Sequence, residues 1–511
     1  MLLVNDFLEN SAAQSPEKVA LIYDGQRLTY AQLDAMANRM ANALQTNGVQ
    51  RGDRVVLYLP NSVELVVGIF ATLKANAVFV VANPTTKQDK LTYMVNNCRA
   101  KALVSRARQA SAVDGVLENA PSVGYTIFTD KGADEAAAAR IHSTTFDNIQ
   151  ASYSDTRPPR QTIDQDLACL IYTSGSTGDP KGVMSAHCNV VFAASSIITY
   201  LENVPDDIVI CLSPLSFDYG LYQLLMVFKF GGTLVLERGF TYPTQILKRM
   251  EEERVTGFPG VPTIFAILLN MDLSGYDLSS LRYITNTAAA LPPSHIKQIG
   301  EIFPWATMYS MYGLTETKRT LYLPPAQLQN RPGSVGIAIP GTEVWIEDEA
   351  GNRLGAGQIG ELVIRGGHVM RGYWENPEAT AKRYRSGPIP GERVCYSGDL
   401  FRMDEEGFLY FVGRGDDIIK SRGEKVAPKE VENVLYDLPG VVETAVIGIP
   451  DPILGEAIKA FVVTQNSHLT EKDILRHCRA NLEDFMVPQI IEFRDALPKT
   501  SSGKITKKNL S

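Results

Sequence analysis

The segment IYTSGSTGDPKG, residues 171–182, gathers hydroxyl groups and glycines ahead of a lysine. Glycines let the backbone approach an anion, while hydroxyls, backbone N–H groups and a lysine supply donors and positive charge. The segment follows a short apolar run, residues 167–172, that is typical of a buried strand. We therefore predict a phosphate cradle made by Thr173, Ser174, Gly175, Ser176, Thr177, Gly178 and Lys181.

Other interpretations of this segment are weaker. A solvated Ser/Gly linker is the plain alternative, but linkers rarely stand between a strand and a lysine. A Walker loop is excluded because, counting from Gly175, the position that needs the second glycine is Pro180. A Ser/His/Asp hydrolase is disfavoured since no GxSxG elbow precedes a helix. We expect His187, shortly after the segment, to pack rather than to react.

Further short strings follow in a fixed order along the chain. They are MYGLTE at 311–316, YSGDL at 396–400, GRGDDIIKSRGEKVAPKEVE at 413–432 and PKTSSGK at 498–504. With the phosphate segment, they make the chain resemble the adenylate-forming superfamily of acyl-CoA synthetases, nonribosomal peptide synthetase adenylation domains and luciferases. The resemblance implies that a carboxylate attacks the α-phosphate of ATP, that pyrophosphate leaves, and that a thiol then takes the acyl group. Catalysis of such a step rests on positioning and electrostatic stabilisation.

The resemblance assigns the reacting phosphate to a few residues. Lys504 would lie between the substrate carboxylate and the α-phosphate, where a charge on a flexible stem can follow developing negative charge. Glu316 would hold Mg²⁺, with Thr315 at the α-phosphate. Without the family, Glu316 could equally be a helix-capping carboxylate and Lys504 a solvated charge in a polar tail.

The nucleoside would lie against a second set of residues. An ionised Asp399 can accept both ribose hydroxyls, and Arg414 would approach the same sugar. The resemblance places the adenine against Tyr312 and beside the loop that contains Asn286 and Ala288. Taken alone, Asp399 is a residue of a Gly-Asp turn and Arg414 a surface arginine.

The acyl pocket leaves the substrate class open between amino, fatty and aryl acids. In amino-acid-activating members an FD motif supplies an aspartate for the substrate ammonium, and Asp218 stands in the matching place. Arg319 follows the TE motif, where small or apolar side chains are commoner. It either neutralises Asp218, which then needs no substrate amine, or faces a phosphate or solvent. The remaining predicted lining, suited to a small or medium acyl group, is Tyr219, Tyr222, Pro259, Gly260 and Met311.

The second half-reaction needs a rearrangement and a thiol. The resemblance places a hinge at Asp416, about which rotation would replace Lys504 by a face carrying Gly423 and Lys425. The acceptor is free CoA or the phosphopantetheine of a separate carrier protein, since no carrier domain follows within the sequence. The alternatives to a thioester-forming ligase are a luciferase-like oxygenase and a nucleotide-binding protein without catalysis.

The elements that position these residues follow from hydrophobic periodicity. Alternating strands and helices predict an α/β fold with largely parallel sheets in the N-terminal half. Short alternating strands over 333–411 predict a small β-barrel-like subdomain. Beyond it, we expect a mobile α+β domain whose tail, 500–511, is a loop. The predicted domains are therefore a core at 1–415 and a lid at 416–511. Predicted strands include 54–59, 77–81, 101–104, 124–129, 209–212, 233–236, 257–261, 441–449 and 457–464; predicted helices include 35–44, 220–230, 244–253, 263–270, 428–435 and 471–481.

Composition limits the remaining classes. The chain has 511 residues, 45% of them apolar, which predicts a globular protein of at least two domains. A formal net charge of -8 without a basic block disfavours a nucleic-acid partner. The apolar run at 65–73 is shorter than the roughly 20 residues of a membrane span, and no secretory or SKL signal is present. Six scattered cysteines without metal spacing predict reduced thiols in a cytoplasmic protein.

Overall fold

The structure is a computed structural model of the 511-residue chain. It describes residues 2–140, 142–173, 180–287, 291–421, 424–451, 454–465, 469–500, 504–507 and 510. Most of the predicted phosphate cradle (174–178), Ala288 and Gly423 lie outside the described residues. The backbone of Asp416 and Lys425 is described, whereas their side chains are not.

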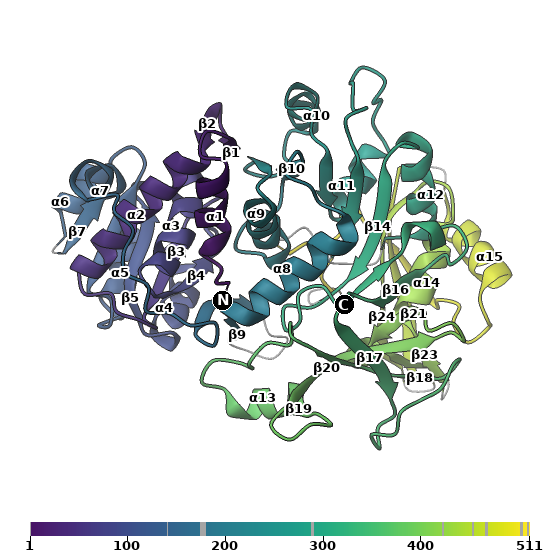
Figure 1. Ribbon diagram of the computed structural model, residues 1–511. Helices are drawn as coiled ribbons and strands as arrows, with labels where there is room; N and C mark the ends of the chain where they lie inside the picture. Colours follow the sequence, from purple (N-terminus) through teal and green to yellow (C-terminus); the bar gives the residue numbers. More distant parts are fainter. Residues whose placement is uncertain are drawn as a thin grey trace.

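The strands β8 and β9, on either side of the predicted phosphate segment, lie at one edge of a largely parallel sheet, shown at the left of Figure 1. Alternate residues of one central strand face different cores: Val55 and Leu57 pack with α2 and α3, while Val56 packs with α4 and α5. Helices on both faces are what a parallel sheet requires. In spatial order the strands are β7 (Ser143–Thr145), β6 (Tyr125–Thr129), β5 (Ala100–Arg106), β3 (Arg54–Tyr58), β4 (Val78–Ala82), β8 (Leu167–Thr173) and β9 (Lys181–Ala186), with only the last pair antiparallel. The helices are α1 (Asp6–Gln14), α2 (Tyr30–Thr46), α3 (Val63–Lys74), α4 (Gln88–Asn97), α5 (Ala110–Leu117), α6 (Ala133–Ala138) and α7 (Phe146–Ser152), with the 3-10 turn η1 (Ala107–Gln109).

A longer sheet runs through the rest of the core. Its neighbours are parallel from β1 through β14 and antiparallel from β14 to β17, so the predicted barrel-like strands continue this sheet while burying a core of their own. Helices α8 and α9 lie between the two sheets (Figure 1). In spatial order the strands are β17 (Thr342–Glu347), β18 (Ile359–Gly366), β20 (Arg393–Met403), β21 (Leu409–Arg414), β16 (Ser334–Ala338), β15 (Leu321–Leu323), β14 (Thr307–Tyr312), β13 (Tyr283–Asn286), β12 (Gly257–Gly260), β10 (Ile208–Cys211), β11 (Thr233–Leu236), β1 (Val19–Tyr23) and β2 (Gln26–Thr29), with β19 (Tyr384–Ser386) beside β20. The helices are α8 (His187–Leu201), α9 (Asp218–Phe230), α10 (Pro243–Glu252), α11 (Pro262–Leu268), α12 (Pro293–Ile302) and α13 (Pro377–Arg383), with η2 (Pro325–Gln327).

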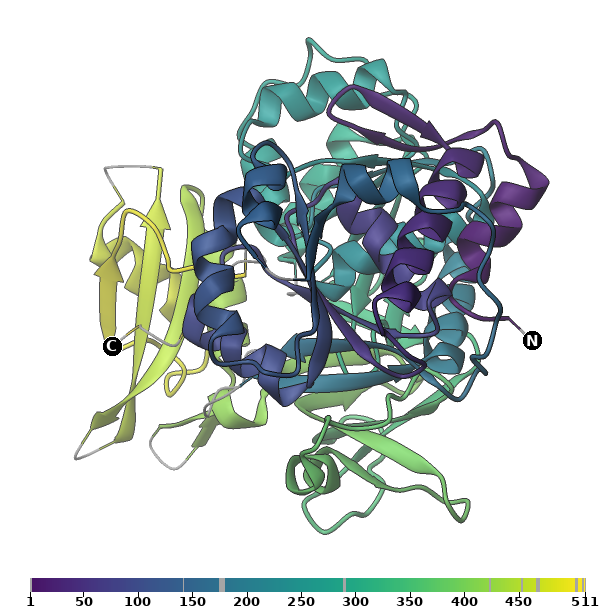
Figure 2. The same cartoon turned by 90° about the vertical axis from the view of Figure 1, so that its left-hand side faces the viewer.

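The C-terminal part forms a separate sheet with its own core, at the left of Figure 2. Its strands are β23 (Glu424–Val426), β22 (Ile419–Ser421), β25 (Gly455–Thr464), β24 (Val441–Asp451) and β26 (Ile490–Phe493); its helices are α14 (Pro428–Tyr436) and α15 (Glu471–Asn481), after the turn η3 (Gly415–Asp417). The tail closes on itself through a bridge between Lys499 and Ile505, and Leu510 packs beside Phe461. The domain boundary at Asp416 and the mobility of this part stay predictions.

Sequence periodicity located these elements closely, with informative differences at the ends. The predicted strand 233–236 and helix 471–481 coincide with β11 and α15. The predicted helix 35–44 begins earlier, because Thr29 and Gln32 form a capping box that starts α2 at Tyr30.

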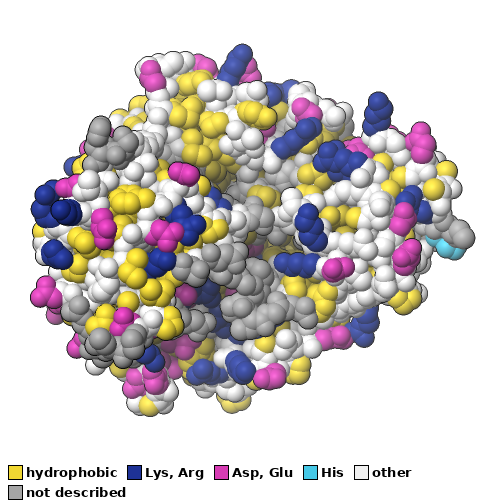
Figure 3. All heavy atoms as spheres, turned by 180° about the vertical axis from the view of Figure 1, so that it is seen from behind, with side chains coloured by type: hydrophobic (Ala, Val, Ile, Leu, Met, Phe, Trp, Pro, Cys, Tyr) yellow, Lys and Arg dark blue, Asp and Glu magenta, His cyan; other side chains and the backbone are white. Residues whose placement is uncertain are grey.

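The distribution of surface charge and the state of the cysteines agree with the expectations from composition. Lys and Arg side chains are interspersed with Asp and Glu over the face in Figure 3. All six cysteines are free of disulfides. Among the described residues, no helix combines the length and the apolar character that crossing a membrane requires.

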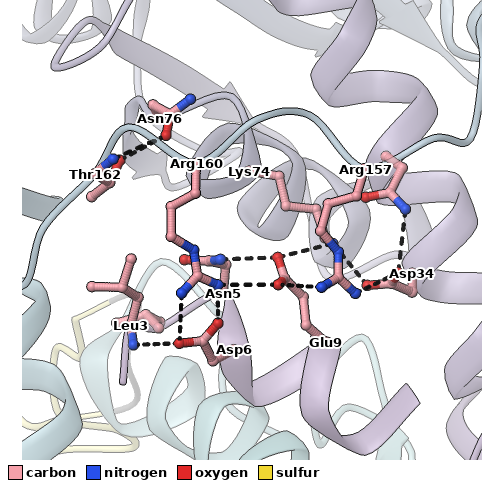
Figure 4. A network of polar contacts seen from close by, with 12 residues as sticks. Leu3, Asn5, Asp6, Glu9, Asp34, Lys74, Asn76, Arg157, Arg160 and Thr162 are labelled. Carbon is pink, nitrogen blue, oxygen red and sulfur yellow. Dashed lines mark hydrogen bonds and ion pairs between the residues drawn. The ribbon is translucent and has the colours of Figure 1, made fainter. Parts of the chain in front are cut away.

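The N-terminal helix is fixed by a group of charges centred on the buried Asp6, Glu9 and Lys74. With Asp34, Arg157 and Arg160 they form what we call the N-terminal ion cluster (Figure 4). Lys74 Nζ lies 3.1 Å from Glu9 Oε1 and 2.8 Å from Asp34 Oδ1. Burial alone would raise the pKa of Glu9, but Lys74, Asn5 and Arg157 together hold it below its ordinary value. The cluster ties α1, α2 and α3 to the segment before β8.

Candidate active site

Three predicted nucleotide contacts from three strands of the long sheet meet in space, two of them at strand ends. Asp399 on β20 is paired in register with Arg414 on β21, and Arg414 Nε lies 3.6 Å from Asp399 Oδ1. Tyr312, the last residue of β14, donates its hydroxyl to Asp399 Oδ2 at 2.6 Å. Burial raises the pKa of Asp399 although Tyr312 and Arg414 favour its charged form. The carboxylate is therefore short of donors, which two sugar hydroxyls can supply.

Asn286 ends β13 directly beside β14. Parallel neighbours end at the same edge of a sheet, and this edge is where ligands of open α/β sheets usually bind. Asn286 is buried and lies opposite Ser310 in the register. The strand ends thus bring together the predicted nucleoside contacts that the structure describes.

The loop at 313–320, between β14 and β15, is compact and held by close backbone contacts. A Cβ on Gly313 would stand 1.7 Å from the carbonyl oxygen of Lys318, so only glycine fits there. Lys318 itself adopts a left-handed backbone with φ 61 and donates its ammonium to the Thr315 carbonyl at 2.9 Å. Thr320 N closes the loop on the Tyr312 carbonyl at 2.9 Å.

Glu316 points from this loop toward a polar group that the sequence did not single out. Tyr373 donates its hydroxyl to Glu316 Oε1 at 2.5 Å, and Arg383 Nε lies 3.9 Å from the same oxygen. Lys181, at the start of β9, holds its ammonium 5.5 Å from the centre of the Tyr373 ring. The predicted metal ligand and the predicted phosphate lysine therefore share one neighbour. Thr173 ends β8, with its hydroxyl 3.4 Å from the Lys181 carbonyl.

Asp218 is the first residue of α9, where a carboxylate is favoured by the helix dipole. It is 7% exposed. No ion pair between Asp218 and Arg319 forms in the described part of the chain, so a direct pairing, one of the two alternatives for Arg319, is absent there. Burial lowers the pKa of Lys318, and the charge of Asp218 is the strongest influence that opposes this shift. Lys318 is thus a cationic neighbour of Asp218 that sequence reasoning missed.

Lys504 reaches the site from the C-terminal tail. Its ammonium lies 5.2 Å from the centre of the Phe217 ring, next to Asp218 in the chain. Its carbonyl accepts from Thr500 N at 2.7 Å, which holds the turn. Burial lowers the pKa of Lys504, whereas the charges of Asp218 and Asp399 raise it. The lysine therefore stands within electrostatic reach of both the pocket side and the ribose side of the site.

The predicted pocket residues differ in how they are placed. Tyr219 is buried, and its hydroxyl contacts the Thr285 hydroxyl at 2.7 Å, so only its ring remains for other contacts. Met311 receives the hydroxyl of Tyr200 on its sulfur at 2.9 Å. Tyr222 is also buried, and no partner of its hydroxyl lies in the described part of the chain. Pro259 and Gly260 lie on β12, with no room for a side chain at Gly260 because Phe265 would stand 2.5 Å from its Cβ.

The residues that the sequence missed are Tyr373, Arg383, Lys318 and Tyr200. Tyr373 and Arg383 come from the turn and helix before β19, far from Glu316 in sequence, and no spacing signals that contact. Lys318 stands beside Arg319, and two adjacent cations after the TE motif were the available signal. His187 is 1% exposed and accepts the Val4 N–H on Nδ1 at 3.1 Å, as its predicted packing role requires.

Comparison with known proteins agrees with this geometry. The family model described as AMP-binding enzyme matches residues 8–374, and the AMP-binding enzyme C-terminal domain matches residues 430–504. A long-chain-fatty-acid–CoA ligase of Bacillus subtilis (strain 168) is 32% identical, with 99% of this chain and 94% of the relative aligned. A feruloyl-CoA synthase of an Amycolatopsis species is 34% identical over 97% and 96%.

Solved structures give the same result. An anthranilate CoA ligase, AuaEII, in complex with anthranoyl-AMP superposes with a TM-score of 0.92 at 29% identity, over 100% of this chain and 96% of that one. ATP-bound MatB from Rhodopseudomonas palustris gives 0.89 at 29% identity, over 100% and 98%. Relatives at more than 30% identity cover nearly the whole sequence, and the AMP-binding enzyme model by itself matches more than half of it. The chain belongs to the family of AMP-binding enzymes.

Proposed function

We propose that this enzyme activates a carboxylic acid with ATP and transfers the acyl group to the thiol of CoA. An oxygen of the acid bonds to the α-phosphorus and pyrophosphate leaves; the thiol sulfur then bonds to the acyl carbon, and AMP leaves. The observation that carries the proposal is the position of Lys504, partly buried beside Phe217 and within electrostatic reach of Asp218 and Asp399. A cation there stabilises charge that develops on the phosphate oxygens.

The nucleotide is assigned to the ends of β13, β14 and β21 together with Asp399 in the middle of β20. Asp399 accepts the ribose hydroxyls, and Tyr312 orients its carboxylate through the 2.6 Å hydrogen bond. Arg414 stands beside the same sugar. We assign the phosphates to Thr173, Lys181, Thr315 and the cradle residues at 174–178, as predicted from the sequence.

Magnesium fits the donor set around Glu316. Mg²⁺ prefers oxygen ligands and is often held by one carboxylate together with phosphate oxygens and water. Within the described residues, no group of three His, Cys, Asp or Glu side chains forms a cage of its own, which agrees with such a shared arrangement. Glu316 would hold the ion, and the hydrogen bond from Tyr373 fixes the orientation of its carboxylate. When bound, the ion neutralises phosphate charge.

The relatives favour CoA over a carrier protein as the acceptor, since the ligases and the synthase named above are CoA enzymes. We further propose that the part beyond Asp416 rotates after adenylation and withdraws Lys504. Gly423 and Lys425 would then face the thiol. An amino acid remains the competing substrate class because Asp218 is a buried carboxylate at the start of α9.

The test is acid-dependent exchange of labelled pyrophosphate into ATP, screened over fatty, aryl and amino acids, followed by detection of the CoA thioester. We expect exchange with at least one acid, and thioester and AMP when CoA is added. Exchange with no acid, or turnover to ADP and phosphate, contradicts the proposal. If an amino acid gives the fastest exchange and Asp218→Ala abolishes it, the competing substrate class is correct.

A further inference from the structure

Arg319 is a buried cation for which the described part of the chain supplies no anionic partner. It is 3% exposed, and its buried Nε and Nη2 atoms make no hydrogen bond with any residue that the structure describes. An unsatisfied buried donor is costly, and more so when it is charged. Such a group is retained where a ligand supplies the missing acceptor.

The neighbours of Arg319 are aromatic and lie on the acyl side of the site. Its guanidinium carbon stands 4.5 Å from the centre of the Tyr219 ring. Burial raises the pKa of Tyr200, and the charge of Arg319 is the strongest influence in the opposite direction. The hydroxyl of Tyr222 is also buried without a partner in the described chain, and the charge of Arg319 acts on it too. These tyrosines come from α8 and α9, whereas the partners of Glu316 are Tyr373 and Arg383.

The described charges on this side do not balance. Lys318 and Lys504 lie within electrostatic reach of Asp218, the carboxylate at the start of α9, and both feel the charge of Arg319. The carboxylate that is activated brings one negative charge to Lys504, and Asp218 opposes the charge of Lys318. Among these groups, Arg319 then remains uncompensated. Glu316 is engaged elsewhere, by Tyr373 and Arg383.

We propose that the acid which this enzyme activates carries a second carboxylate, and that Arg319 binds it with help from the hydroxyl of Tyr222. This inference rests on the proposed function, because it concerns the far end of the acid activated there. A planar guanidinium offers a carboxylate parallel hydrogen bonds, and burial makes that pair selective. An alkyl or unsubstituted aryl tail in the same place would leave Arg319 unpaired and excluded from water.

The experiment compares matched acids that differ only in the second carboxylate: adipate with hexanoate, glutarate with pentanoate, and isophthalate with benzoate. The measurement is kcat/KM for the acid in labelled pyrophosphate exchange, for the wild type, Arg319→Met, Arg319→Lys and Tyr222→Phe. We expect the wild type to prefer one diacid over its monoacid by on the order of 10²-fold. Arg319→Met should lose that preference and keep or improve exchange with the monoacid.

Arg319→Lys should retain part of the preference, since the charge remains but the fork is lost. Tyr222→Phe should reduce it by about tenfold or less. Unfolding curves of each variant separate loss of fold from loss of selectivity. The inference is overturned if monoacids or acids with a neutral hydroxyl are preferred, or if Arg319→Met leaves the diacid to monoacid ratio unchanged. Those results leave the proposed function intact, whereas exchange with no acid at all ends both.

Discussion

Two regions of this molecule bury cations in opposite ways. In the N-terminal ion cluster, Lys74 is 1% exposed and touches the carboxylates of Glu9 and Asp34. On the acyl side of the candidate active site, Arg319 is nearly as buried and lies against the aromatic ring of Tyr219. A paired buried charge fixes the positions of the elements that carry it. An unpaired one keeps its electrostatic potential for a ligand.

The largest effect that we expect comes from replacing Lys504, in the candidate active site. Lys504→Ala removes a partly buried cation beside the reacting atoms, and we expect adenylation to fall on the order of 10² to 10³-fold. Pyrophosphate exchange measures it. The matched control is Lys507→Ala in the same tail, because Lys507 is paired with Glu432 at 2.8 Å. Equal losses in both variants would show that the tail acts only as structure.

Lys74 tests the other region of the comparison, the N-terminal ion cluster. Lys74→Met leaves Glu9 and Asp34 without the buried cation between them, although the exposed Arg157 still pairs with both. We expect the free energy of unfolding to fall by about 3 kcal/mol. Denaturant unfolding measures this, while kcat per folded molecule stays unchanged. The control is Lys248→Met, which breaks an exposed 3.7 Å pair with Glu252 and should cost about 0.5 kcal/mol or less. A similar small change at Lys74 would contradict the account.

The pH dependence of stability gives a further test of the N-terminal region, because His187 contacts the N-terminal segment by accepting the Val4 N–H. Burial lowers its pKa from 6.5 to about 4. The unfolded chain therefore binds more protons between these values, and stability falls as the pH drops through this window. From about pH 7 to about pH 5, His187 should account for about 2 kcal/mol of that loss.

The measurement is the difference between the wild type and His187→Gln in unfolding free energy at both pH values. The variant should lose less stability on acidification, and the exposed His142, changed to Asn, should behave like the wild type. Parallel pH profiles of the wild type and His187→Gln would show that His187 does not titrate in this window.

Arg319 gives the smallest expected change in stability, with the opposite sign from Lys74. Removing an unpaired buried charge relieves a cost, although the contact with the Tyr219 ring is lost. Arg319→Met should therefore match the wild type or exceed it by up to about 1 kcal/mol in unfolding free energy. A loss as large as that of Lys74→Met would mean that the guanidinium is structural.

The sequence predicted those features of the fold that depend on residues close together in the chain. Apolar runs bounded by glycine and helix-like spacing located β11 and α15. The motif strings assigned Asp399, Arg414 and Tyr312 to one nucleoside, and the three side chains do lie together in the fold. Each of those residues sits on a strand of the same sheet, and strands are elements that periodicity finds well.

Contacts between distant loops could not be predicted in the same way. The hydrogen bond from Tyr373 to Glu316 joins residues 57 positions apart, and it depends on how β18 and α13 are placed against the loop at 313–320. Arg319 is unusual after the TE motif, but the sequence left open whether it pairs with Asp218. In the structure the cationic neighbour of Asp218 is Lys318, which has a left-handed backbone. Which buried charges are paired is set by packing, not by spacing.

The central claim is that an oxygen of the acid bonds to the phosphorus that remains in AMP. Turnover of an acid labelled with heavy oxygen in its carboxylate, with ATP and CoA, followed by mass spectrometry of the products, tests it directly. The account predicts that the label appears in the phosphate of AMP. Label found only in inorganic phosphate, together with ADP, would contradict it.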